Sequence, residues 1–275
     1  MLYLIRFVIF LLPLLPVVVV TDLAWSQDGQ NQFLKVRRDV LQRVFEGNEK
    51  LNYSISWTGG VKIGDLRLEI ASSSKKGNEI TGRVTDYGLF KLFYPVDDTF
   101  ITYIDSSLRL PYRYEVVQRE GHGSDETKRL SLYDQEQLTV RYQRDEEEPL
   151  DFTISGPVHN EFSSFYITRS LTLEEGEVPV VPTFADKKRH NVEVNVLGKE
   201  EIRTMFGLVK TIRIQPKMTF RGLYDKDGDT VIWLTDDECR VPVRINSKIL
   251  IGSLTADLKS YHNDLCPQYH EERRP

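Results

Sequence analysis

The sequence predicts a mostly β protein built on one strongly curved antiparallel sheet, a half-barrel or barrel-like structure. One crossing helix and a short N-terminal helix complete the expected fold. Apolar residues recur at every second position in many short segments, as expected of half-buried strands. Most connections have hairpin length, which favours antiparallel pairing. Because about a dozen twisted strands do not stay flat, we expect the sheet to curl into a barrel, a half-barrel or two packed sheets.

Composition supports a folded protein with a core rather than a nucleic-acid binder. Of the 275 residues, 40% are hydrophobic and 28% charged, which is enough for a core. The net charge is −5, and the chain has no basic stripe with interleaved aromatic residues, so we expect no nucleic-acid partner. The 13 Tyr and 13 Phe residues favour strands and can line an apolar pocket.

Residues 1–26 have the pattern of a signal peptide. Arg6 precedes an apolar run from Phe7 to Val20, and Ala24 and Ser26 place small residues at the −3 and −1 positions. We therefore expect cleavage between Ser26 and Gln27 and export from the cytoplasm.

The alternative for this segment is a permanent membrane anchor. The uncharged run from Phe7 to Thr21 is shorter than the roughly 20 residues of a spanning helix. Pro13 and Pro16 also weaken a helix here. We therefore expect no stable transmembrane anchor.

A helical lead-in, residues 27–45, follows. Its apolar residues recur at helical spacing between Phe33 and Phe45, which predicts a short amphipathic helix. Packing of this helix against the domain is favoured over a role at a membrane surface.

Residues 46–262 are predicted to form a single antiparallel β domain. The first set of strands is expected at Leu51–Trp57, Leu66–Ile70, Glu79–Tyr87, Thr99–Ile104, Tyr112–Val116, Thr127–Tyr133 and Leu138–Tyr142. The second set is expected at Val192–Val196, Ile202–Thr204, Val209–Ile214, Met218–Leu223, Thr230–Leu234, Val241–Ile249 and Ser253–Tyr261. Trp57 and Trp233 each follow the apolar phase assigned to their strands, so both are expected to point inward.

A helix is predicted between the two sets of strands, at Asn160–Leu171. Asn160 is a favourable N-cap, and Phe162, Tyr166 and Arg169 recur at three and four residues. We expect this helix to cross between the β halves. Two separate cores with a flexible linker near Gly176–Thr183 would contradict this arrangement.

The two cysteines, Cys239 and Cys266, are predicted to form a disulfide. If Ile249 opposes Ser253 in the final hairpin, Cys239 falls opposite residue 263, only three residues before Cys266. An exported chain also meets an oxidising environment. Two independent thiols are the alternative. The polar tail, residues 263–275, is expected to fray unless this bridge holds its start.

No motif in the chain predicts catalysis, a metal or a cofactor. Asp225–Asp229, with Asp236 further on, resembles the start of a calcium loop, but Thr230 stands where Gly is needed, so a hairpin turn is favoured. His159-Asn160-Glu161 copies the H-x-E of deaminases without their P-C-x-x-C partner. The five histidines (His122, His159, His190, His262 and His270) are predicted to be loop or surface residues, and Asp145–Glu148 a solvated turn.

Several short sequence segments, taken together, resemble one known family. They include Phe45–Tyr53, Leu110–Tyr114, Phe162–Arg169, Trp233–Asp237, Arg240–Ile245 and Gly252–Ala256. In this order and spacing they resemble the exported bacterial family catalogued as domain of unknown function 3108, over roughly Phe45 to Tyr261. The resemblance implies a periplasmic protein of a Gram-negative bacterium with an antiparallel β fold. It implies no activity and no catalytic residues.

Three function classes remain. The first is non-enzymatic binding of a hydrophobic or envelope-derived ligand, such as a lipid or other amphiphile, on the concave face of the sheet. The second is a protein–protein module of an envelope assembly, which would dock through a sheet edge or the Phe33–Phe45 helix. The third is an enzyme that acts on envelope glycan through paired carboxylates. The first is favoured, and we expect that the protein is not an enzyme.

Overall fold

Two antiparallel meanders join along the first and last strands of the chain. The first meander consists of β1 (Lys50–Trp57), β2 (Val61–Ser73), β3 (Gly77–Asp86), β4 (Asp97–Asp105), β5 (Pro111–Arg119), β6 (Glu126–Asp134), β7 (Thr139–Arg144) and β8 (Leu150–Thr153). The second consists of β9 (Val180–Ala185), β10 (Lys188–Thr204), β11 (Gly207–Lys217), β12 (Thr230–Thr235), β13 (Pro242–Lys248) and β14 (Ser253–His262). Pairing of β1 with β14 makes one 14-stranded sheet, with β8 and β9 at its two edges.

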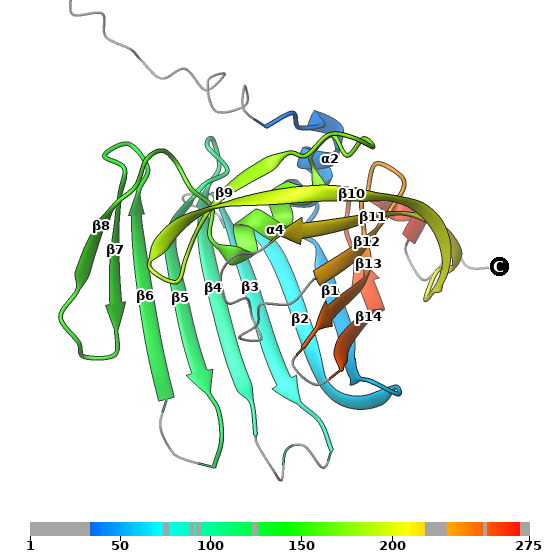
Figure 1. Ribbon diagram of the computed structural model, residues 1–275, viewed down its shortest axis with the longest axis horizontal. Helices are drawn as coiled ribbons and strands as arrows, with labels where there is room; N and C mark the ends of the chain where they lie inside the picture. Colours follow the sequence, from blue (N-terminus) through cyan, green and yellow to red (C-terminus); the bar gives the residue numbers. More distant parts are fainter. Residues whose placement is uncertain are drawn as a thin grey trace, which may run out of the picture.

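The sheet curls without closing, as the computed structural model shows (Figure 1). All its neighbouring strands are antiparallel. The predicted fold class, a mostly β protein with a strongly curved antiparallel sheet, is therefore confirmed. The structure describes residues 34–73, 77–88, 91, 95–122, 126–217, 230–249 and 252–269. Several predictions fall outside these residues: the signal peptide with its cleavage between Ser26 and Gln27, the strand at Met218–Leu223, the Asp225–Asp229 turn, and His270 with the end of the tail.

Helix α4 (Glu161–Arg169) lies in the connection between the two edge strands and packs inside the curl (Figure 1). Asn160 caps it as predicted: the Asn160 side chain accepts a hydrogen bond from the backbone N–H of Ser163, and the Ser163 hydroxyl bonds back to the Asn160 N–H. The ring of Phe162 lies 5.1 Å from that of Phe100 on β4, between ring centroids. The helix thus fills part of the concave face.

Helix α2 (Arg38–Glu46) covers one end of the curl and buries Val40, Val44 and Phe45. It begins five residues later than the predicted start at Phe33. The reason is backbone pairing: the Arg37 N–H donates to the Ser170 carbonyl, and the Thr172 N–H donates to that of Lys35. Both helices have nine residues, and within the described ranges no helix is long and apolar enough to cross a membrane.

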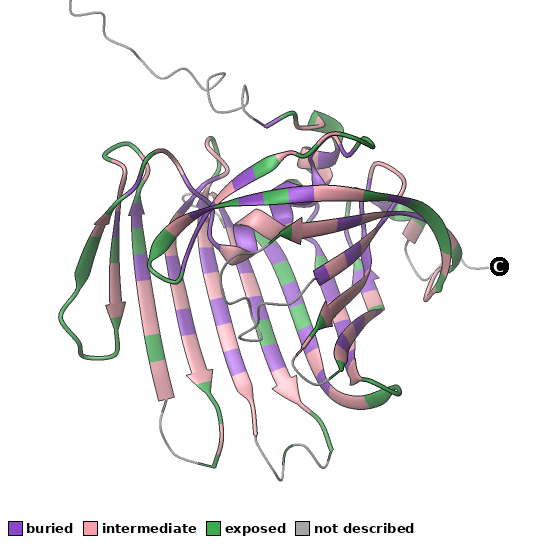
Figure 2. Ribbon diagram, in the orientation of Figure 1, coloured by how far each residue is buried: buried purple, intermediate pink, exposed green. Residues whose placement is uncertain are grey.

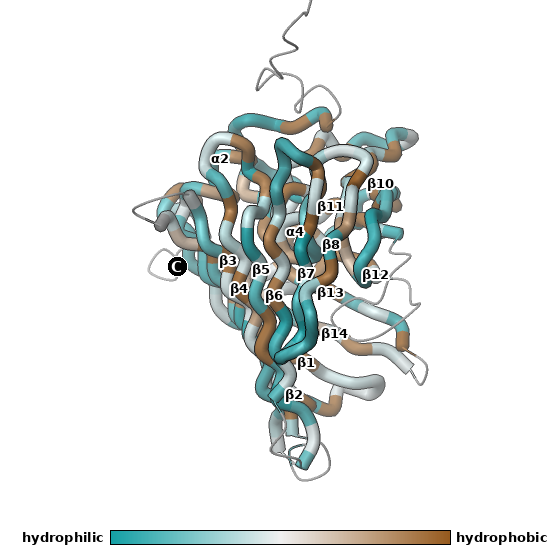
Figure 3. Tube along the Cα trace, turned by 90° about the vertical axis from the view of Figure 1, so that its left-hand side faces the viewer, coloured by the Kyte–Doolittle hydropathy of each residue, from teal (hydrophilic) through white to brown (hydrophobic). Residues whose placement is uncertain are grey.

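Side chains on the strands alternate between the buried inner face and the outer face (Figure 2). The same alternation appears in hydropathy along β3–β6 (Figure 3). Trp57 follows the inner phase, as predicted, and is half-buried. The prediction for Trp233 is wrong: Ile232 and Leu234 face the core, while the Trp233 indole N–H donates to Glu200 Oε1 at 2.7 Å.

Strands β8 and β9 are absent from the sequence prediction. The segment Gly176–Thr183 is not a linker between two cores, because its end belongs to β9, which pairs with β10. Buried side chains of both meanders form one hydrophobic cluster in the described chain. The final hairpin is shifted by one residue from the predicted register, with Lys248 rather than Ile249 opposite Ser253.

Candidate functional site

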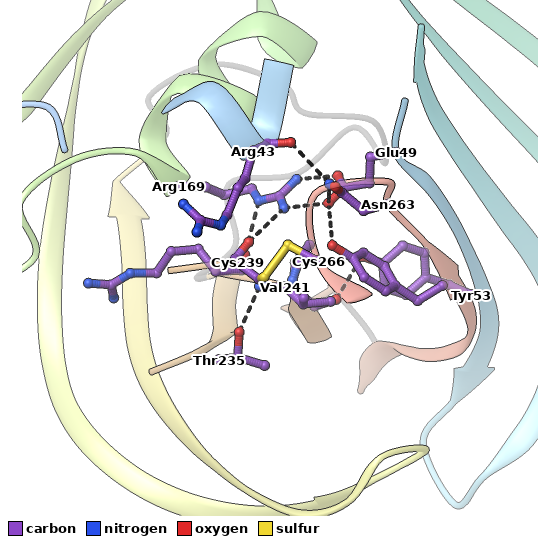
Figure 4. Close-up of polar contacts among 12 residues, drawn as sticks. Arg43, Glu49, Tyr53, Arg169, Thr235, Cys239, Val241, Asn263 and Cys266 are labelled. Atoms are coloured by element: carbon purple, nitrogen blue, oxygen red, sulfur yellow. Dashed lines mark hydrogen bonds and ion pairs between the residues drawn. A yellow bond between two sulfur atoms is a disulfide. The ribbon is translucent and has the colours of Figure 1, made fainter. Parts of the chain in front are cut away.

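A fully buried ion pair ties helix α4 to the centre of the sheet (Figure 4). Arg169 ends α4, and Glu49 immediately precedes β1. Arg169 Nη1 lies 2.5 Å from Glu49 Oε2, and Nη2 donates to Oε1 at 2.8 Å. Burial alone would lower the pKa of Arg169, but attraction to the Glu49 carboxylate outweighs it and raises that pKa. The pair is therefore charged and bidentate.

Neighbouring groups complete the hydrogen bonding of this pair. Arg169 Nε donates to the Arg240 carbonyl at 3.0 Å, and the Tyr261 hydroxyl donates to Glu49 Oε1 at 3.1 Å. Asn263 Nδ2 bridges the Arg43 carbonyl and Glu49 Oε1. We call Glu49, Arg169, Tyr261 and Asn263 the clamp.

The disulfide between Cys239 and Cys266 lies against the clamp (Figure 4). Its Cα atoms are 6.1 Å apart, and both residues are buried. The Cys239 carbonyl accepts a bond from Arg169 Nη2 at 3.4 Å. The bridge thus holds the β12–β13 connection and the segment after β14 around the clamp. Because its charges are paired and enclosed, we interpret the clamp as structural.

The inner face becomes more exposed with distance from the clamp. Along β1, exposure rises from 0% at Leu51 to 3% at Ile55, and Trp57 is half-buried. Along β12 it rises from 0% at Leu234 to 8% at Thr230. The inner face is therefore most tightly enclosed beside the clamp, and slightly less so at the far end, where Leu254 and Thr230 are each 8% exposed.

Four inner residues line the far end in one row. Trp57 pairs with Leu254, Leu254 with Ser247, and Ser247 with Thr230. We call these residues the open row. Trp57 and Leu254 make it partly apolar, whereas the Thr230 and Ser247 hydroxyls bond to each other at 2.9 Å.

A polar group occupies the inner face beside the start of α4. Arg129 on β6 pairs with Val116, an inner residue of β5, so its side chain shares that face. Arg129 Nη2 donates to Gln118 Oε1 at 2.6 Å, and Gln118 Nε2 donates to Asp98 Oδ2 at 3.0 Å. Burial raises the pKa of Asp98 to about 6.

Glu161, the first residue of α4, belongs to the same region. Burial raises the pKa of its carboxyl to about 7, while Arg129 opposes this shift and Asp186 adds to it. Glu161 Oε2 and Arg129 Nε are both buried without a hydrogen-bond partner. The sequence did not predict Arg129 and Glu161 as site residues, because only the fold brings these two distant residues into one region.

The histidines were predicted to be loop or surface residues; His159 lies in the loop before α4, whereas His190 departs from the prediction because it is buried on β10. His122 and His262 are exposed, but His159 and His190 are buried. His159 contacts the Ser163 hydroxyl at 3.2 Å, and its backbone N–H donates to Pro182 on β9, so the fold needs it inside. Burial lowers the pKa of His159 to about 4.

The other singled-out motifs that lie in the described residues form no site. Asp145–Glu148 is an exposed turn, as predicted. His159 and Glu161 flank the cap of α4 and lack a cysteine partner, since the cysteines lie in the disulfide. No group of three or more His, Cys, Asp or Glu side chains in the described residues is arranged to hold a metal ion.

Similarity to known proteins supports the architecture. The family described as "Protein of unknown function (DUF3108)" matches residues 52–259. Among solved structures, a β-barrel-like protein of domain of unknown function DUF1849 from Brucella abortus superposes with a TM-score of 0.56 at 10% identity. The superposition covers 79% of this chain and 98% of the other. A search of curated proteins found no match.

Proposed function

Because this chain belongs to the DUF3108 family, which supplies a fold but no activity, we propose a function from its own inner face. The protein is an exported periplasmic binding protein for a hydrophobic or envelope-derived ligand, a lipid or other amphiphile, and it is not an enzyme. The observation that carries this proposal is the rise in exposure along the inner face towards the open row.

The concave shape suits a ligand with an apolar chain. The alternating apolar residues of both meanders lie on the inner side of one unclosed sheet, and helix α4 packs inside its curl (Figure 1). Removing apolar ligand surface from water stabilises a complex by about 25 cal/mol per Å². The apolar side chains of Trp57 and Leu254 in the open row are placed to contribute such contacts.

The glycan-acting alternative requires two carboxyl groups that are free to act. Asp98 and Glu161 both have a raised pKa. However, Asp98 accepts bonds from Gln118 Nε2 and the Arg119 backbone N–H and is only 5% exposed. It is therefore committed to the sheet, and we do not propose a catalytic pair.

Lipid retention tests the binding function. The chain from Gln27 onward is delipidated by unfolding, refolded, offered envelope lipid extract and analysed by native mass spectrometry. We expect a bound amphiphile in the folded protein. A spectrum that contains only the bare protein would refute the proposal. Fractionation of cells expressing the full chain tests the periplasmic location and loss of residues 1–26.

A pair of neighbouring substitutions tests the place of binding. Leu254→Asn changes an inner side chain of the open row, and Thr255→Asn changes its outward neighbour. Leu254→Asn places a polar group against the apolar part of the ligand, so it should weaken binding by about tenfold. Thr255→Asn should change the affinity little. Equal affinities in both variants, with melting curves that show both folded, would place the ligand elsewhere.

A further inference from the structure

Two carboxyl groups share one amide donor at the end of the sheet where β4 begins and β5 ends (Figure 1). Gln118 Nε2 donates to Asp98 Oδ2 at 3.0 Å and to Glu120 Oε1 at 3.1 Å. The register explains this arrangement, since Val96 pairs with Glu120. Two residues further along the chain, Asp98 therefore lies opposite Gln118 and diagonal to Glu120. The two carboxyl groups thus span the ends of adjacent strands.

Arg129 fixes the orientation of the shared amide. Its Nη2 donates to Gln118 Oε1 at 2.6 Å, so the amide oxygen is already used and the amide nitrogen faces the two carboxyl groups. Asp98 is buried, and its Oδ1 accepts a further bond from the Arg119 backbone N–H at 3.1 Å. Glu120 is exposed. One carboxyl group is therefore held in the sheet, whereas the other has room to turn towards water.

The two carboxyl groups are close enough to compete for a proton. Burial raises the pKa of Asp98 to about 6, the bond from Gln118 opposes this shift, and the Glu120 carboxylate adds to it. Two ionised carboxylates at this distance repel each other, and one proton between them replaces the repulsion with an O–H···O⁻ hydrogen bond. The geometry therefore has two states that differ by one proton.

The other charged groups around the pair lie on both faces of the sheet. On the inner face, Arg129 of β6 adds a positive charge next to Gln118, and Asp86 of β3 adds a negative one two residues from Val84, which pairs with Asp98. The ion pairs of the outer face are those of Arg83 with Asp97 and of Arg119 with Glu126. The outer carboxylates thus have cations of their own.

We propose that Asp98 and Glu120 form a pH-sensitive switch that fastens the end of β5 to the start of β4. When Asp98 holds a proton, its hydroxyl donates to the Glu120 carboxylate, and this bond supports the backbone pairing of Glu120 with Val96. When the proton leaves to water, the two carboxylates repel each other and Glu120 turns outward, which loosens this end of the sheet. The switch needs no ligand, so it stands or falls apart from the proposed function.

Hydrogen exchange of single backbone amides, followed by NMR, tests the switch. The Gly121 N–H donates to the Pro95 carbonyl across the same strand ends, so its protection reports their opening. The pKa of Asp98 rises from an ordinary 3.8 to about 6, so the fastened state is favoured at low pH and loses its advantage as pH rises through 6. We expect protection about tenfold lower at pH 7 than at pH 5, after correction for intrinsic exchange. Equal protection at both pH values would overturn the proposal.

Substitutions separate the switch from a general effect of pH. Asp98→Asn keeps a neutral donor beside Glu120, so protection of Gly121 should stay within about twofold between pH 5 and pH 7. Asp97→Asn, the control, changes the neighbouring outward carboxyl, which pairs with Arg83, and should keep the full pH dependence. The same pH dependence in folded Asp98→Asn as in the wild type would overturn the proposal.

Glu120→Gln tests the second carboxyl group directly. It removes the repulsion, so the midpoint of the Asp98 titration, read from the ¹³C resonance of its carboxyl group, should move to lower pH. The pH dependence of Gly121 protection should weaken in parallel. A midpoint that does not move would show that the two carboxyl groups do not share a proton, and the proposal would fall even if Asp98 alone titrates near pH 6.

Discussion

Arg169 and Glu49, 120 residues apart in the chain, form a bidentate ion pair with 1% and 0% of their side chains exposed. The pair joins the end of the crossing helix to the strand that unites the two meanders. Removing one partner would leave an uncompensated buried charge, which costs far more than the net contribution of the intact pair. The clamp therefore fixes how deeply α4 sits inside the curl.

Glu49→Leu should destabilise the protein by about 3–5 kcal/mol, because Arg169 would keep its charge without its partner. Glu49→Leu with Arg169→Met should cost less than the sum of the two single changes. Urea unfolding measures all three. Arg141→Met, which breaks the exposed pair with Asp151, is the control and should barely move the midpoint. Strict additivity of the two clamp substitutions would contradict this account.

The disulfide should hold the end of the chain without being required for folding. Cys239 and Cys266 are separated by 27 residues, and a loop of this length gives about 3–4 kcal/mol in the chain-entropy description. We expect no free thiol in denatured, unreduced protein, and a lower Tm after reduction. Cys239→Ser with Cys266→Ser should melt at the Tm of the reduced protein. Two reactive thiols per chain would show that the bridge is absent from the protein.

His159 and Glu161 should give opposite pH dependences of stability. The pKa of folded His159, about 4, lies below its usual 6.5, so its contribution is lost as pH falls from 6.5 towards 4. The pKa of folded Glu161, about 7, lies above its usual 4.5, so its contribution is lost as pH rises from 4.5 through 7. Each effect is the difference in unfolding free energy between the wild type and one variant, His159→Asn or Glu161→Gln, at pH 4, 5.5 and 7. If these differences in unfolding free energy do not change with pH, the pKa shifts of His159 and Glu161 are refuted.

The fold class was accessible from the sequence because its signals are local. Asn160 with a following helical pattern predicts a capped helix, and the strict alternation from Leu51 to Trp57 predicts a strand with one buried face. Strand β9 was missed because Pro182 interrupts its pattern, and proline is tolerated there only because β9 is an edge strand. Strand β8 was missed because it has only four residues, so its alternation of Leu150 and Phe152 with Asp151 and Thr153 is too short to be a strong signal.

The candidate site was not accessible, because it depends on contacts between distant segments. Arg129 lies on β6 and Glu161 on α4, and the sequence around either residue does not predict that the other lies in the same region. The same holds for Glu49 and Arg169. The error at Trp233 has a different cause: Val231 to Leu234 is a continuous apolar run, so periodicity cannot tell which face is buried.

The two faces of β12 should therefore respond differently to truncation. Leu234 is completely buried, and Leu234→Ala should cost about 2–5 kcal/mol. Trp233→Ala should cost less despite its larger side chain, because the indole lies on the outer face beside Glu200. Urea unfolding of both variants measures the difference. A larger loss at Trp233 than at Leu234 would mean that the assignment of the two faces is wrong.

Gly82 should prove necessary for the packing of helix α4 against β3. A Cβ at this position of β3 would lie 2.5 Å from Phe162 Cε1 and 3.4 Å from Leu68 Cδ2, so the Phe162 ring would have to move. Gly82→Ala should therefore destabilise the protein by about 1–3 kcal/mol through overpacking. Thr85→Ala, on the outer face of the same strand, is the control for the change in strand residue.

A smaller partner side chain should partly rescue that substitution. Phe162→Leu leaves space beside β3, so its cost should be smaller in the Gly82→Ala background than in the wild type. A double-mutant cycle from urea unfolding gives the coupling, expected at about 0.5–3 kcal/mol. Because the two positions meet only when α4 is packed inside the sheet, a coupling near zero would show that the helix does not occupy the inner face.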